Sequence, residues 1–212
     1  MGTVKLNVRG VAKYIAAGPA KQRRVLRDYK YPDPQGYAQA GYYRDAQEII
    51  EAFHCGRYEN EWLLQRAAEL QTEASATVVG QRSTRLRSNA TALRSYATHF
   101  GNRRLEVLPH LKLRTTIAGV IISAQPDLHV LERRRERIIK FEFAKGQSPE
   151  ELKVESQLFL QAAVAMGLGF GGGDVLCYDC RSGEVYRGRV GSRLNADIEA
   201  ACQTIAAIWD DL

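Results

Sequence analysis

Two residues of opposite charge stand two positions apart in a segment whose neighbouring residues are apolar. Lys140 and Glu142 lie in a β-rich run, and side chains alternate between the faces of a strand, so both should project from one face. Ile139, Phe141 and Phe143 should then point from the other face into a core. An amine and a carboxylate in this arrangement form either an ordinary ion pair, which contributes little to stability, or part of a polar site.

A second set of charged residues lies on a predicted helix between Gln81 and Arg94, where leucines remain available for burial. Its arginines are Arg82, Arg85, Arg87 and Arg94. They could bind a nucleic-acid phosphate backbone, although exposed arginines on a helix are usually only solvated. The whole chain carries 30 Lys and Arg against 24 Asp and Glu, a net charge of +6 with a pI near 9.2. This balance favours an anionic partner, with DNA as the expected one.

The composition is that of an ordinary folded protein. The chain has 212 residues, of which 45% are hydrophobic and 25% charged. No run approaches the roughly 18 apolar residues of a membrane span, and the N-terminus lacks the apolar core of a secretory signal. We therefore expect a cytoplasmic protein with reduced cysteines and no membrane association.

The first hundred residues predict a basic helical region, residues 1–100. A helical pattern over Val8–Tyr29 is interrupted at Gly18-Pro19, and another runs over Tyr43–Phe53. The proline-free stretch Glu59–Tyr96 predicts two or three helices with a break near Val79-Gly80.

The remainder, residues 101–212, predicts a core of mixed sheet and helices, so the fold class is α/β of the α+β kind. Strands are expected near Leu105–Thr116, Gly119–Val130 and Arg137–Phe143, in one antiparallel sheet. Ser148 and the residues after it predict the start of a helix, Pro149–Met166, packed on that sheet. A hairpin and a closing amphipathic helix, Asn195–Trp209, follow.

This order of elements resembles the PD-(D/E)XK nuclease superfamily, in particular its RecB-type exonuclease branch, over about Ala92–Leu212. In that family the second strand supplies an Asp, the third an acid and a lysine two residues apart, and the next helix often a glutamine. Asp127, which follows Pro126, the pair Lys140 and Glu142, and Gln157 fall in those regions. The pair is inverted here, with the lysine at the family's acid position.

The resemblance implies a Mg²⁺-dependent phosphodiesterase acting on DNA, with Asp127 and Glu142 as metal ligands. Lys140, or Lys145 reaching back from the strand end, would position the attacking water, and Gln157 would complete the catalytic set. Two alternatives stay open. The site has decayed and the domain binds nucleic acid or a partner protein, itself included, without cutting; or Lys140 and Glu142 form only an ordinary ion pair. Glu155, on the same predicted helix as Gln157, is interpreted as solvated.

Cysteine and histidine add no clear site. Cys55, Cys177, Cys180 and Cys202 are similar in number to the ligands of the iron–sulfur nucleases of that branch. Cys177 and Cys180 lie in a predicted strand, however, and their odd spacing puts them on opposite faces, which favours buried thiols over a cluster. Among the histidines only His129, two residues beyond Asp127, is placed to join the charged residues.

Overall fold

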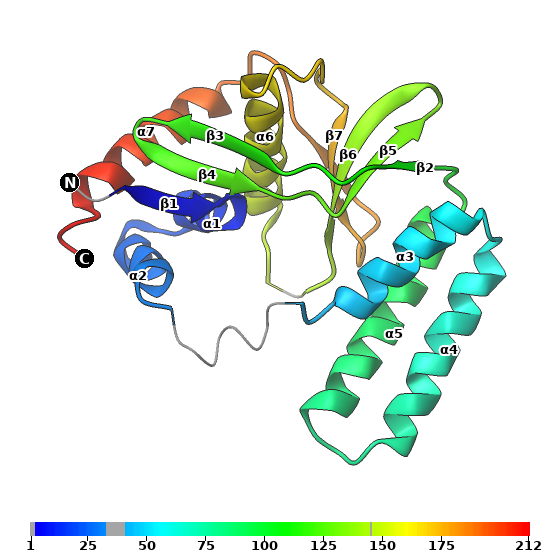
Figure 1. The fold of residues 1–212 in the computed structure, drawn as a ribbon. Coiled ribbons are helices and arrows are strands. Elements are labelled where there is room, and N and C mark those ends of the chain that lie inside the picture. The colour runs from blue at the N-terminus through cyan, green and yellow to red at the C-terminus, as the bar shows by residue number, and fades with distance from the viewer. Residues whose placement is uncertain (1–2, 33–40, 145) are drawn as a thin grey trace.

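The computed structural model describes residues 3–32, 41–144 and 146–212 (Figure 1). Lys145 lies outside the described residues. Within them the chain forms seven helices and eight strands, which confirms the α+β class. No helix of this described part combines the length and apolarity needed to cross a bilayer.

The chain begins with a short strand and two helices, β1 (Val4–Asn7), α1 (Val8–Ala16) and α2 (Pro19–Lys30). The Asn7 side chain caps α1 by accepting a hydrogen bond of 2.7 Å from the Gly10 N–H. The break between α1 and α2 falls at Gly18-Pro19, as predicted. β1 was not predicted; it pairs in parallel with a strand more than 110 residues later.

Three helices follow, α3 (Arg44–Gly56), α4 (Asn60–Ala76) and α5 (Gln81–Phe100). The break between α4 and α5 lies at residues 77–80, which confirms the prediction made from Val79-Gly80. α4 and α5 run antiparallel as a hairpin that projects from the rest of the molecule (Figure 1).

The prediction of one antiparallel sheet built from three long strands is wrong. The strands are β2 (Glu106–Leu108), β3 (Leu113–Ile117), β4 (Val120–Ala124), β5 (Leu128–Glu132), β6 (Arg135–Glu142), β7 (Val175–Asp179) and β8 (Val185–Arg187). They form a sheet of order β1-β4-β3 and another of order β2-β5-β6-β7-β8. The two longer predicted strands are interrupted around Pro109 and Pro126, because proline has no N–H to donate to the ladder.

Two helices complete the fold, α6 (Pro149–Ala165) and α7 (Leu194–Ile208). α6 crosses between the parallel strands β6 and β7 and begins where predicted, with the Ser148 side chain accepting from the Glu151 N–H. It packs on the larger sheet and also contacts β3 and β4 of the smaller one.

The buried apolar residues form two clusters, one on each face of the larger sheet. One cluster joins β1, α1 and α2 to α6, α7 and the smaller sheet, so the first 30 residues pack with the C-terminal half. The other joins α3, α4 and α5 to the opposite face of β5, β6 and β7. Ile139, Phe141 and Phe143 belong to this second cluster, as predicted, so Lys140 and Glu142 lie on the α6 side.

Candidate functional site: a charged cluster beside β6

Asp127 and Lys140 are brought together by the pairing of β5 with β6. Leu128 is opposite Ile139 in the antiparallel register, so Asp127 lies beside Lys140. The Lys140 Nζ donates to Asp127 Oδ1 at 2.8 Å, and the Gln47 side chain of α3 donates to the same oxygen at 2.9 Å. The Phe141 N–H donates to Asp127 Oδ2 at 2.6 Å. Both oxygens of Asp127 therefore have donors from the protein.

Lys140 is held in its charged form. Burial by itself would lower its pKa, but the adjacent Asp127 carboxylate outweighs burial, and the pKa of Lys140 is raised. The pair is only partly open to solvent, with the Asp127 side chain 10% and the Lys140 side chain 30% exposed. Removing either charge would leave its partner poorly compensated.

Glu142 binds a different set of donors at the end of β6. Its Oε1 accepts from the Ala144 N–H at 2.7 Å, and its Oε2 lies 3.5 Å from the Arg9 guanidinium of α1. Burial raises the pKa of Glu142, and Arg9 opposes that effect. Asp127 and Glu142 thus have separate cationic partners.

The interpretation of Glu155 as a solvated residue is wrong. It is 3% exposed, and the Gln147 side chain donates a hydrogen bond to it. Burial raises its pKa to about 7, despite the opposing effects of Arg9 and Lys140. A sequence signal was present, because Glu155 lies three residues after Leu152 and four before Phe159, on the stripe of α6 that packs inward.

Gln157 and His129 lie apart from this cluster. The Gln157 side chain donates to the Arg189 carbonyl at 3.1 Å and to Asn195 Oδ1 at 2.7 Å, and it accepts from the Arg189 N–H at 2.9 Å. It therefore fixes the segment that leads into α7. The His129 ring contacts the Pro109 carbonyl at 2.8 Å and the Glu136 carboxylate.

The carboxylates, as arranged, do not fit a bound Mg²⁺. Hard oxygen ligands are the right chemistry for this ion, but each of the three acids already accepts hydrogen bonds from the protein. Within the described residues, no group of three His, Cys, Asp or Glu is placed to hold a metal ion. The assignment of Asp127 and Glu142 as metal ligands remains a prediction.

The arginines of α5 divide into two kinds. Arg82 lies 2.9 Å from Glu73 of α4, and Arg85 lies 3.8 Å from Asp45 of α3, so both have acidic partners within the helical region. Arg94 is exposed. Arg87 lines a groove between α5 and the ends of β6 and β7.

This groove, which we call the α5 groove, has a volume of about 530 Å³ and combines guanidinium with hydroxyl groups. Its polar lining comprises Tyr43, Arg87, Arg181, Thr84, Ser88, Thr91 and Ser95. Arg181 also donates to the Ala144 carbonyl at 3.0 Å, which places the groove beside the turn that binds Glu142. Sequence reasoning missed Arg181, because it comes from the β7–β8 turn, far in the sequence from α5.

The cysteines are dispersed. Cys177 belongs to the cluster on the α6 face and Cys180 to the opposite cluster, as their spacing predicted. Cys202 is buried on α7 and Cys55 is exposed on α3. Burial raises the pKa of the thiols of Cys177 and Cys180, which keeps them protonated.

Comparison of the sequence with protein-family models and with curated proteins finds no match.

Proposed function

We propose that this protein is a nucleic-acid-binding module with a PD-(D/E)XK-like core in which basic side chains, instead of a metal ion, neutralise the acidic cluster. The observation that carries the proposal is the contact of 2.8 Å between Lys140 Nζ and Asp127 Oδ1. In the family that the sequence resembles, the acid and the lysine stand in the opposite order on this strand. Here the lysine has the place of the acid and binds the neighbouring aspartate.

The charges of the cluster balance without a metal. Lys140 and Arg9 supply two positive charges beside Asp127 and Glu142. Glu155, whose pKa is raised to about 7, adds only a fraction of a negative charge near neutral pH. A divalent cation would have to displace one or both basic groups, and that displacement would reduce its affinity.

The surface for nucleic acid is the α5 groove. Arg87 and Arg181 offer guanidinium forks that match phosphate oxygens, and the hydroxyl groups beside them are typical of backbone contacts. The net charge of +6 adds long-range attraction for a polyanion. We propose that this binding takes place in the cytoplasm, and DNA is the first ligand to test.

The test is a fluorescence anisotropy titration of labelled single- and double-stranded DNA over a series of salt concentrations. Arg87→Gln with Arg181→Gln should weaken binding and reduce the slope of log affinity against log salt by about two, because about one counterion is released per phosphate contact. Arg66→Gln with Arg114→Gln removes the same charge from exposed side chains outside the groove and serves as the control. Equal losses in both double variants, or no binding by the wild type at low salt, would refute the proposal.

A second candidate is a metal-dependent phosphodiesterase. The observation that favours it is the buried Glu155, which adds a third carboxylate to the cluster and has a raised pKa. Binding of a divalent ion would require Lys140 and Arg9 to move away and Glu155 to release its proton. Calorimetry with Mg²⁺ and Mn²⁺ in two buffers of different ionisation enthalpy would detect that proton, and a nuclease assay in the same ions would detect cleavage. Proton release coupled to metal binding, with cleavage, would favour this candidate over the first.

A further inference from the structure

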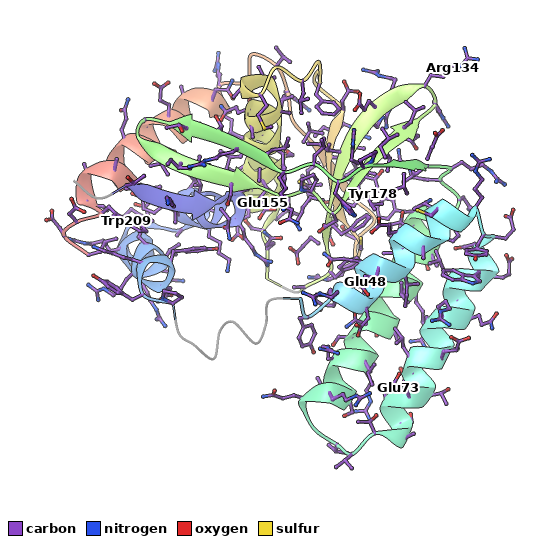
Figure 2. All side chains as sticks on the ribbon, viewed as in Figure 1. Glu48, Glu73, Arg134, Glu155, Tyr178 and Trp209 are labelled. Atoms are coloured by element: carbon purple, nitrogen blue, oxygen red, sulfur yellow. The ribbon has the colours of Figure 1, made fainter. Side chains whose placement is uncertain are left out.

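A cavity of about 440 Å³ lies beside the turn between β5 and β6, at the opposite end of these strands from the charged cluster. We call it the arginine pocket. Its arginines are Arg57, Arg103, Arg104, Arg133 and Arg134, against two glutamates, Glu59 and Glu106. They come from the turn after α3, the segment after α5 and the β5–β6 turn. Figure 2 shows Arg134 at the tip of the β5–β6 hairpin, well separated from Glu155.

Three of these arginines have an unfavourable backbone conformation. Among the described residues, four that are not glycine have a positive φ, and Arg57, Arg133 and Arg134 are three of them, at 54°, 51° and 64°. A two-residue hairpin turn with positive φ at both positions favours Asn-Gly, and a left-handed residue after a helix favours glycine. At these three positions, asparagine or glycine would be more stable than arginine, and yet all three arginines line one cavity.

The same three arginines lack acidic partners within the described part of the chain, where no ion pair within 4.0 Å includes them. The other two differ. Arg103 donates to both oxygens of Glu132, at 2.8 and 2.7 Å, and so forms a fixed wall of the pocket. Arg104 lies 3.5 Å from the exposed Glu59.

The pocket also has uncharged lining residues. Phe53 and His54 line it, and His54 contacts the Tyr96 hydroxyl at 2.7 Å. Burial, with a smaller effect from Arg103, lowers the pKa of His54 to about 4, so this ring is neutral at pH 7. The positive charge of the pocket comes from guanidinium groups alone, which suit phosphate oxygens.

We infer that the arginine pocket binds a ligand with a terminal phosphate, either a free nucleotide polyphosphate or the phosphorylated end of a nucleic-acid strand. Arginines from three segments of the chain line this one cavity, so the ligand should carry concentrated negative charge. A terminal phosphate carries nearly two charges at pH 7, and a phosphodiester carries one. This inference does not rest on the function proposed for the α5 groove.

The test is calorimetric titration of the full chain with ATP and with inorganic tripolyphosphate. The variant Arg57→Gly, Arg133→Asn, Arg134→Gly removes three charges and at the same time introduces residues that favour the existing backbone, so it should fold. We expect its affinity to fall at least tenfold. Arg66→Gln, Lys112→Gln, Arg114→Gln removes the same number of charges from exposed residues outside the pocket and should change affinity less than threefold.

The source of the phosphate is separated with an oligonucleotide that carries either a 5′-phosphate or a 5′-hydroxyl. A preference for the phosphorylated strand that the pocket variant loses assigns the pocket to strand ends, while binding of ATP or tripolyphosphate without that preference assigns it to free polyphosphates. Either result supports the inference. It is overturned if the wild type binds none of these ligands, or if the pocket and control variants lose affinity equally. A failure of the α5 groove variants to affect DNA binding would leave this result unchanged.

Discussion

The charged residues at the two ends of the β5–β6 hairpin differ in burial and in the partners that they have. At the end near α6, Asp127, Lys140 and Glu142 are mostly buried, and each has protein partners at hydrogen-bond or ion-pair distance. At the turn, Arg133 and Arg134 are exposed, have left-handed backbones and have no acidic partner among the described residues. The charges of the first end have their partners within the protein, whereas the backbone of the second end is in a conformation that costs stability.

This difference distinguishes charged residues that the fold accounts for from charged residues that it does not. A buried charge with complete partners is explained by the fold, because losing the partner would cost several kcal/mol. An exposed charge at a strained position is not explained by the fold, since a smaller residue would suit the backbone better. The arginine pocket therefore gives the stronger evidence for a ligand, although the family resemblance directs attention to the acidic cluster.

The largest effect expected is on the buried end. Asp127→Ala should lower the free energy of unfolding by about 3–4 kcal/mol, because it removes the partner of Lys140 and a charged acceptor for the Phe141 N–H. Asp127→Asn, which keeps one acceptor oxygen, should cost less. Urea denaturation at pH 7 measures both changes.

The sign of the Asp127 result also distinguishes the two candidate functions. If the carboxylates were held together for a metal ion, removing Asp127 would relieve repulsion from Glu142 and Glu155 and would stabilise the metal-free protein. A stability gain in Asp127→Ala would therefore contradict the neutralised cluster and favour the phosphodiesterase.

The next largest effect is the pH dependence of the free energy of unfolding that Glu155 causes. Its pKa rises from an ordinary 4.5 to about 7 in the folded protein, so the folded state holds this proton more tightly than the unfolded chain. Stability should fall as the pH rises from about 4.5 to just above 7, by about 3 kcal/mol from this group. Glu155→Gln should remove that contribution and be the more stable protein at pH 8.

Urea denaturation at pH 5, 6, 7 and 8 follows this slope. Glu150→Gln, an exposed acid in the first turn of the same helix, is the control and should keep the slope of the wild type. Parallel pH profiles for the wild type and Glu155→Gln would show that the carboxylate is not held in its protonated form.

Much of the fold could be predicted from local sequence signals. The elements that depend on pairing between distant parts of the chain could not. Gly18-Pro19 and Val79-Gly80 marked helix breaks because glycine and proline act on their own backbone. β1 has four residues and is defined by its parallel pairing with β4, which no local pattern encodes. The division into two sheets was missed although Pro109 and Pro126 mark it in the sequence.

The candidate site was predictable to the same extent. The resemblance assigned Asp127 and Lys140 to one site, and the register of β5 and β6 puts them side by side. Arg9 and Gln47, which complete the cluster, come from α1 and α3, more than 75 residues earlier, and only the tertiary fold brings them there. The positive φ of the three arginines could not be predicted either, because the sequence gives the residue type at a turn and not its backbone angles.

The smallest effect expected has the opposite sign and comes from the turn. Arg133→Asn with Arg134→Gly should raise the free energy of unfolding by about 1–2 kcal/mol, because both residues then fit the positive φ of a two-residue turn. Ala118, which also has a positive φ but lies in the β3–β4 turn outside the pocket, gives the control. Ala118→Asn should raise stability slightly without changing the binding of tripolyphosphate. Urea denaturation and calorimetry on the same preparations would show whether the turn variant gains stability while it loses ligand. If it loses both, the arginines support the hairpin instead of a ligand, and the contrast between the two ends of β5 and β6 fails.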